Sequence, residues 1–258
     1  MDISHIIFVV LFGSLIGFTT GLLGGGGSIL AVIGLTYIFH EGLSVTVSTS
    51  LAIVGTSAFI GVLLKSHTKT VRFKTGLVIG LASIAGAYPG ALLHHLVTDK
   101  IVLSLFGFLI IIVGIDMLRH KDSQKQSTST SETLETPVWR HWFILVLIGV
   151  AVGFIAGFFG VSGGFLMVPA LVIILHLSPR QAIGTSLLVI TLTSISAFLS
   201  HLHLGTIDYK LIGLCVAGAI VGVICGSLLS ERVPGRQLTK ILGIFIIIIA
   251  VYTIYRNI

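Results

Sequence analysis

Ten apolar runs alternate with short polar segments along the chain. Eight of them reach about 17 residues, the length at which a helix crosses a hydrocarbon core of about 30 Å. The other two, at 28–39 and 164–177, would form helices of only about 18–21 Å. The pattern predicts an all-α, polytopic transmembrane helix bundle that includes two short, broken or re-entrant helices. The runs cover residues 6–23, 28–39, 43–64, 75–97, 101–118, 143–159, 164–177, 182–200, 211–229 and 238–255.

The two short runs occupy equivalent places in a duplicated sequence. An ungapped offset of 136 residues, from Gly17 to Gly153, matches the chain with itself. Chance alignment of apolar sequences matches leucine, isoleucine and valine, whereas this offset matches glycine, histidine, threonine and serine. It therefore indicates two homologous repeats. Matched pairs include Gly21 with Gly157, Gly24 with Gly160, Gly27 with Gly163, His40 with His176, Thr49-Ser50 with Thr185-Ser186, His67 with His203, and Gly86 with Gly222.

One hydrophilic stretch, residues 119–141, separates the repeats. It is rich in serine and threonine and has no apolar period, which is typical of a flexible linker. We therefore divide the chain into a first transmembrane repeat at 1–118, a cytoplasmic linker at 119–141 and a second transmembrane repeat at 142–258.

The basic residues between the runs favour inverted repeats. If each short run completes a crossing, the repeats are inverted; if it dips in and returns, they are parallel. Cytoplasmic loops carry an excess of Lys and Arg. The inverted arrangement places twelve basic residues inside and three outside, against ten and five for the parallel one. Both glycine breaks must then lie at depth, because each short helix falls about 10 Å short of a full crossing.

A glycine-rich break precedes each short run, GLLGGGGS at 21–28 and GFFGVSGG at 157–164. A helix that starts inside the membrane presents unpaired N–H groups and a positive dipole end, which suits a small anion. Tight helix crossing or a sharp turn would explain the glycines without a ligand. The candidate substrate-binding residues are Gly24, Gly25, Gly26, Gly27, Ser28, Gly160, Ser162, Gly163 and Gly164.

Hydroxyl pairs begin the next long helix of each repeat. Thr49 and Ser50 match Thr185 and Ser186, and we add these four residues to the candidate substrate site. Their hydroxyls could bind a substrate oxyanion, cap a broken helix, or bond only to their own helix backbone.

Histidines at matched positions end the two short helices. His40 and His176 could act in gating or in proton coupling, or could be ordinary interfacial residues. Chemistry of other kinds is unsupported, because no carboxylate or cysteine cluster accompanies His201 and His203, and no His–Asp pair accompanies Ser162. We expect no metal, no cofactor, no catalytic residue and no enzyme activity.

The composition is typical of an integral membrane protein. The chain is 55% hydrophobic and 9% charged, whereas soluble domains carry about 25% charged residues. The formal net charge of +6 comes from short loops, so we expect no nucleic-acid partner. The expected partners are the lipid bilayer and a small anionic solute, and a homodimer is left open. The expected location is the cell membrane, as a multi-pass protein in the plasma membrane of a prokaryote.

The glycine motifs resemble those of the sulfite exporter TauE/SafE family. The segments that carry the likeness are GLLGGGGS at 21–28, GFFGVSGGFLMVP at 157–169 and GTSL at 184–187, and it extends over about residues 6–256. Ile33 and Ser28 depart from it, since the second repeat has Pro169 and Gly164 there. The resemblance implies a secondary transporter that exports small anions, sulfur-containing ones such as sulfite, sulfonates or thiol acids.

Three other functions stay open on the sequence alone. A passive anion channel would use the same glycine breaks without saturable counterflow. An intramembrane enzyme would turn over a substrate in detergent. A structural membrane partner would tolerate bulky side chains in both glycine breaks.

Overall fold

The structure is a computed structural model of the chain. It describes residues 3–37, 39, 43–68, 70–94, 97, 105, 108, 111, 138–159, 163–201 and 209–235, with 237, 238, 240, 241, 243, 244 and 248. Its elements are helices, and no strand occurs among these residues. They are α1 (Ile3–Leu23), α2 (Gly27–Tyr37), α3 (Leu43–Ser66), α4 (Phe73–His94), α6 (Val138–Phe159), α7 (Gly164–Ile173), α8 (Pro179–His201) and α9 (Tyr209–Arg232).

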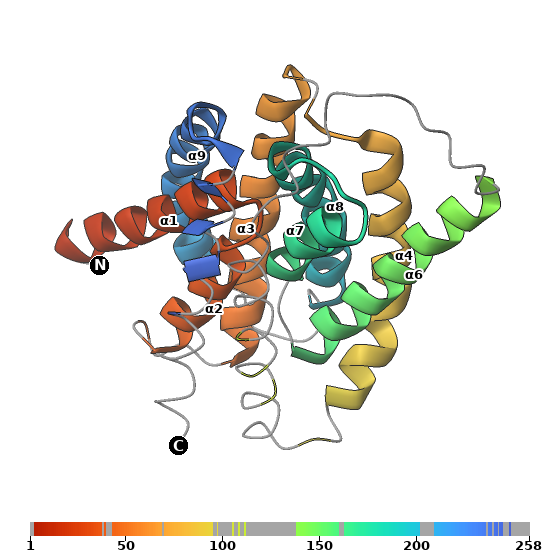
Figure 1. Cartoon of the computed structure of the whole chain (residues 1–258). Helices are drawn as coiled ribbons and strands as arrows, with labels where there is room; N and C mark the ends of the chain where they lie inside the picture. Colours follow the sequence, from red (N-terminus) through yellow and green to blue (C-terminus); the bar gives the residue numbers. More distant parts are fainter. Residues whose placement is uncertain are drawn as a thin grey trace.

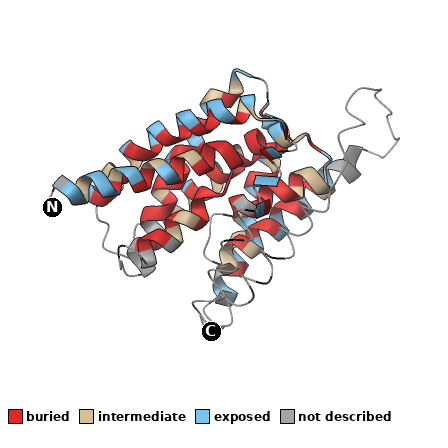
Figure 2. Ribbon diagram, turned by 60° about the vertical axis from the view of Figure 1, so that its left-hand side comes forward, coloured by how far each residue is buried: buried red, intermediate tan, exposed pale blue. Residues whose placement is uncertain are grey.

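Five of the helices are long and apolar enough to cross a membrane, namely α1, α3, α6, α8 and α9. Figure 2 shows exposed residues along the outer faces of the helices, and many of the exposed residues are large and apolar. Leu11 is 63% exposed and Leu81 62%. Because an exposed apolar surface of this extent is stable in lipid and not in water, the chain is a multi-pass membrane protein.

Two close helix pairs flank a central group. In Figure 1, α1 lies against α9 on one side and α4 against α6 on the other, with α3, α7 and α8 between them. Glycines bring α1 and α9 into backbone contact: a Cβ atom added at Gly13 or Gly17 would come closer than 3.0 Å to the carbonyl oxygen of Cys215 or Ala219. Small residues permit such an approach within membranes.

The second close pair repeats the contacts of the first at the 136-residue offset. A Cβ atom at Gly149 would come closer than 3.0 Å to the carbonyl oxygen of Ile79, and one at Gly153 to that of Ser83. Adding 136 to Gly13 and Gly17 gives Gly149 and Gly153, and subtracting it from Cys215 and Ala219 gives Ile79 and Ser83. Each close pair therefore joins one helix from each half of the chain.

Helices α3 and α8 cross in opposite directions at the centre. Gly55 approaches Ser194, while Gly61, further along α3, approaches Leu187, which is earlier in α8. Gly61 also approaches Val223, and Lys65 bonds to Ser230, so α3 runs parallel to α9.

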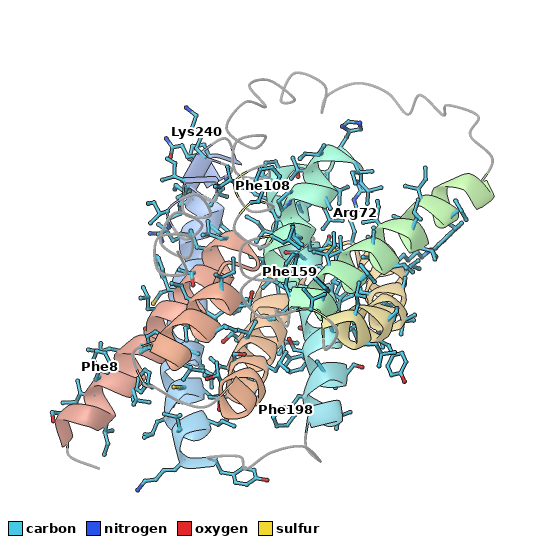
Figure 3. All side chains as sticks on the ribbon, turned by 90° about the horizontal axis from the view of Figure 1, so that it is seen from below. Phe8, Arg72, Phe108, Phe159, Phe198 and Lys240 are labelled. Carbon is cyan, nitrogen blue, oxygen red and sulfur yellow. The ribbon has the colours of Figure 1, made fainter. Side chains whose placement is uncertain are left out.

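Basic residues from both halves gather at one end of the bundle, which we call the basic end. Lys65 closes α3 and contacts the end of α9, and Arg180 at the start of α8 donates to the carbonyl oxygens of Glu231 and Val233. The amide of Arg72, before α4, bonds to α8. In Figure 3, Arg72 and Lys240 lie toward one end of the molecule and Phe198 toward the other.

The short helix α2 turns back along α1. Gly27 lies against Thr20 and Ile16, Gly34 lies against Phe12, and the Phe39 ring is 5.3 Å from that of Phe12. Helix α2 thus starts beside the last turns of α1 and runs back toward the beginning of α1.

Candidate functional site

The first glycine break is buried inside the protein. Every residue from Gly24 to Ser28 is buried, and Gly24 has a φ of 73°, a left-handed conformation that glycine adopts without strain. The Gly24 amide closes α1 by donating to the Thr20 carbonyl at 2.9 Å. The Ser28 hydroxyl donates to the Gly25 carbonyl at 3.0 Å and so braces the turn into α2.

This break also stops short of the basic end. Gly21, near the end of α1, lies beside Val223 and Ser227 of α9. Helix α9 continues from Ser227 to Arg232, another five residues or about 7.5 Å. The chain therefore reverses from α1 into α2 below the end of the bundle.

The second break ends in a left-handed glycine that starts α7. Gly163 has a φ of 67° and is the N-cap residue of α7, and its carbonyl accepts hydrogen bonds from the amides of Leu166 and Met167. A Cβ atom at Gly163 would stand 2.7 Å from that of Ala156. Gly160 and Ser162 of the predicted site lie outside the described residues.

The two breaks meet each other in the interior. A Cβ atom added at Gly164, the first residue of α7, would stand 3.0 Å from Cα of Gly25 and would overlap the Ile190 side chain. Both glycines are buried. Segments 139 positions apart thus touch through their backbones where the two short helices begin.

One predicted hydroxyl pair lies at the first break. The Ser186 hydroxyl donates to the carbonyl oxygens of Gly24 at 2.7 Å and Ile183 at 2.8 Å. Thr185 accepts a hydrogen bond of 3.2 Å from the Arg72 amide and thereby caps the start of α4. Ser186 therefore fixes the break to α8, while Thr185 ties α8 to α4.

The other hydroxyl pair does not join it. Since Gly61 opposes Leu187, Thr185 lies level with about residue 63 of α3, and Thr49 is about 20 Å from that level along the helix. Ser50 is also buried. Thr49 is 1% exposed, and its hydroxyl has no hydrogen-bond partner within the described part of the chain.

Of the two histidines predicted to act in gating, the one that the structure describes lies at the surface. His176 is exposed and has a φ of 49° in the turn that follows α7, where the Leu177 amide donates to the Leu171 carbonyl. His40 lies outside the described residues. No group of three metal-ligating side chains occurs in the described ranges.

Lys65 is a buried residue of the basic end that the apolar pattern does not predict. The apolar run ends at residue 64, whereas α3 continues to Ser66 and carries Lys65 into the protein, where it is 3% exposed. The nearest signal in the sequence is its position one helical turn after Gly61, in phase with the buried face of α3.

Comparison with known proteins identifies the family of the chain. The family model described as "Sulfite exporter TauE/SafE" matches residues 8–253. A "Probable membrane transporter protein" of Xylella fastidiosa (strain 9a5c) is 30% identical, covering 100% of this chain and 98% of its own length. For YunE of Bacillus subtilis (strain 168), the identity is 28%, with 99% of each chain covered, and for YdhB of the same strain it is 27%, with 89% and 91% covered.

No solved structure matches the chain. The sequence relatives all bear the name of membrane transporters, which confirms the prediction of a transporter and not an enzyme. With a match that spans nearly every helix, the chain belongs to the sulfite exporter TauE/SafE family of membrane transporters.

Proposed function

We propose that the chain exports small anions across the cell membrane, with sulfur-containing anions such as sulfite, sulfonates or thiol acids as substrates. The family's printed description supports a sulfite-like substrate. The chemistry of the two breaks supports an anion, because the first amides of α2 and α7 have no partner one turn earlier in their own helices.

The contact between Gly25 and Gly164 is the observation that carries this proposal. It brings the starts of α2 and α7 together in the interior of the bundle. The positive ends of two helix dipoles then converge on one region, where a low dielectric strengthens their attraction for negative charge. The substrate would bind beside Gly24–Ser28 and Gly160–Gly164, with Ser186 at the first break and Thr49 and Ser50 serving the second.

Inverted repeats and alternating access complete the proposal. Two facts support inversion: α3 and α8, which the duplication equates, run in opposite directions, and Lys65 and Arg180 from different halves lie at the same end. The parallel arrangement would put those two residues on opposite sides. Repeats related in this way recur in secondary transporters that rock around a central site.

A bulky side chain at Gly26 tests the site. Gly26 is buried and lacks the positive φ of Gly24, so its backbone accepts a side chain without conformational strain. We expect Gly26→Leu to abolish sulfite transport into proteoliposomes while the protein still inserts and melts cooperatively. Gly213→Leu is the matched control, because no atom lies within 4 Å of the added Cβ there. Normal transport by Gly26→Leu would refute the site.

Counterflow separates a carrier from a channel. Vesicles loaded with unlabelled sulfite should accelerate the uptake of labelled sulfite, because a carrier exchanges a bound anion on one side for one on the other. The rate of uptake should also saturate with sulfite concentration. Flux that rises linearly with concentration and shows no counterflow would identify a passive pore.

A further inference from the structure

Lys65 is a buried cation with one hydroxyl partner. Its side chain is 3% exposed, and its Nζ donates to the Ser230 hydroxyl of α9. No carboxylate oxygen within the described part of the chain lies within 4.0 Å of that nitrogen. An ammonium group has three N–H donors, so two of them remain for another acceptor.

A buried hydroxyl lies between Lys65 and the first glycine break. Ser230 donates its own proton to the Ser227 carbonyl at 2.7 Å. Ser227 is 2% exposed, and its hydroxyl has no hydrogen-bond partner among the described residues. Its Oγ is 3.0 Å from the place of a Cβ on Gly21, three positions before Gly24. Unused donors thus extend from Lys65 toward the start of the break.

The other basic residues that the structure describes at this end are exposed. Arg180 is held by the carbonyl oxygens of Glu231 and Val233 at 2.8 and 3.3 Å. The Glu231 carboxylate attracts the Lys65 ammonium group from more than 4.0 Å away, and the Arg180 guanidinium group repels it. Among the basic residues that the structure describes at this end, Lys65 is therefore the buried one, and its spare donors lie inside the protein.

Burying an ammonium group without a counter-ion costs several kcal/mol. A lysine near a helix end ordinarily avoids that cost by extending to the water. We infer that Lys65, with Ser227 and Ser230, forms an entry site for a small oxyanion at the basic end of the bundle. The role as an entry site rests on the proposed function, since it would pass the anion on to the glycine breaks.

The site belongs to one end of the bundle only. The 136-residue offset pairs Lys65 with His201 and Ser230 with His94, so the second repeat has no permanent cation at the matching place. Loss of Lys65 should therefore affect anions that arrive from the basic end and spare those that arrive from the other.

Transport kinetics test the one-sided effect. In proteoliposomes of defined orientation, Lys65→Met should raise the half-saturating sulfite concentration at the basic end about tenfold, as expected for losing one charged hydrogen bond. At the other end the change should stay within about twofold, and Lys65→Arg should recover part of the loss. Lys74→Met, an exposed lysine in the first turn of α4, is the matched control. No change in Lys65→Met, or an equal change at both ends, would overturn the entry site.

Binding by detergent-purified protein gives an independent readout. Sodium sulfite, against sodium chloride of equal ionic strength, should raise the melting temperature of the unmodified protein and should raise that of Lys65→Met by less, because this variant keeps only the glycine breaks. Gly26→Leu should keep the part of the rise that depends on Lys65. Ser227→Ala, which keeps the lysine, should weaken the rise and replaces Lys65→Met if the latter does not insert. A full rise in both Lys65→Met and Ser227→Ala would overturn the entry site. A Lys65-dependent rise without transport would leave the anion site standing and refute the proposed function.

Discussion

Gly17 of α1 and Ala219 of α9 touch through their backbones, since a Cβ atom at Gly17 would come closer than 3.0 Å to the Ala219 carbonyl oxygen. Gly153 and Ser83 have the same relationship in the pair of α6 and α4. At these positions no side chain separates the paired helices, so the packing depends on glycine there.

A methyl group at either glycine should separate the paired helices. We expect Gly17→Ala and Gly153→Ala each to destabilise the protein by about 1–3 kcal/mol, the usual cost of overpacking. The measurement is thermal melting in detergent, followed by size-exclusion chromatography. Gly213→Ala is the control and should be neutral or slightly stabilising, because its added Cβ would meet no atom within 4 Å. Equal melting temperatures for the three variants would contradict this packing.

Two buried threonines of α8 should differ in their importance. Thr185→Val removes the acceptor of the Arg72 amide and should cost about 1–3 kcal/mol, because it leaves a donor at the start of α4 unpaired. Thr191→Val loses only a bond to the Leu187 carbonyl within the same helix and should cost less than about 1 kcal/mol. Thermal melting of the two variants side by side checks the difference. A loss of stability in Thr191→Val as large as that in Thr185→Val would contradict the prediction.

A glycine substitution at position 176 should show whether His176 is only a turn residue or acts in gating. The φ of 49° at His176 is a left-handed conformation, which costs a residue with a side chain roughly 1 kcal/mol more than glycine. His176→Gly should therefore preserve or raise the melting temperature, with transport unchanged. His67→Gly, at an exposed turn without a positive φ, should give no such gain. Slower transport by a stable His176→Gly variant would instead support gating.

Labelling of single cysteines should reveal the orientation of the halves. Ser4, Thr68 and His176 are exposed, and each can be changed to cysteine after Cys215→Ala and Cys225→Ala remove the native thiols. For inverted repeats, a membrane-impermeant maleimide should reach positions 68 and 176 from one side and position 4 from the other. Labelling of 68 and 176 from opposite sides would rule the inversion out.

Local features of the fold could be predicted from the sequence. Apolar length and glycine content placed the short helices at 28–39 and 164–177, and they occur as α2 (Gly27–Tyr37) and α7 (Gly164–Ile173). Helix ends were less accurate, since polar residues can continue a helix beyond its apolar run. Helix α6 begins at Val138, five residues before the run at 143–159, and α3 continues to Ser66.

Contacts between the halves could not be predicted. The duplication shows that Thr49 and Thr185 are equivalent, but it does not show where equivalent residues lie relative to each other in space. These two lie to either side of the place where Gly55 and Gly61 cross α8. The pairing of α1 with α9 could not be predicted for the same reason.

The exchanged pairing of α1 with α9 and of α4 with α6 limits how the protein can change shape. Each pair locks a helix of one half to a helix of the other through direct backbone contact. In the proposed transport cycle we therefore expect these mixed pairs to move as rigid blocks, so that neither half swings as a unit. We expect the relative movement where α3 crosses α8 and where the short helices begin. Synthesis is constrained as well, because α1 contacts α2 and α3 early but cannot make its backbone contacts with α9 until α9 has been made.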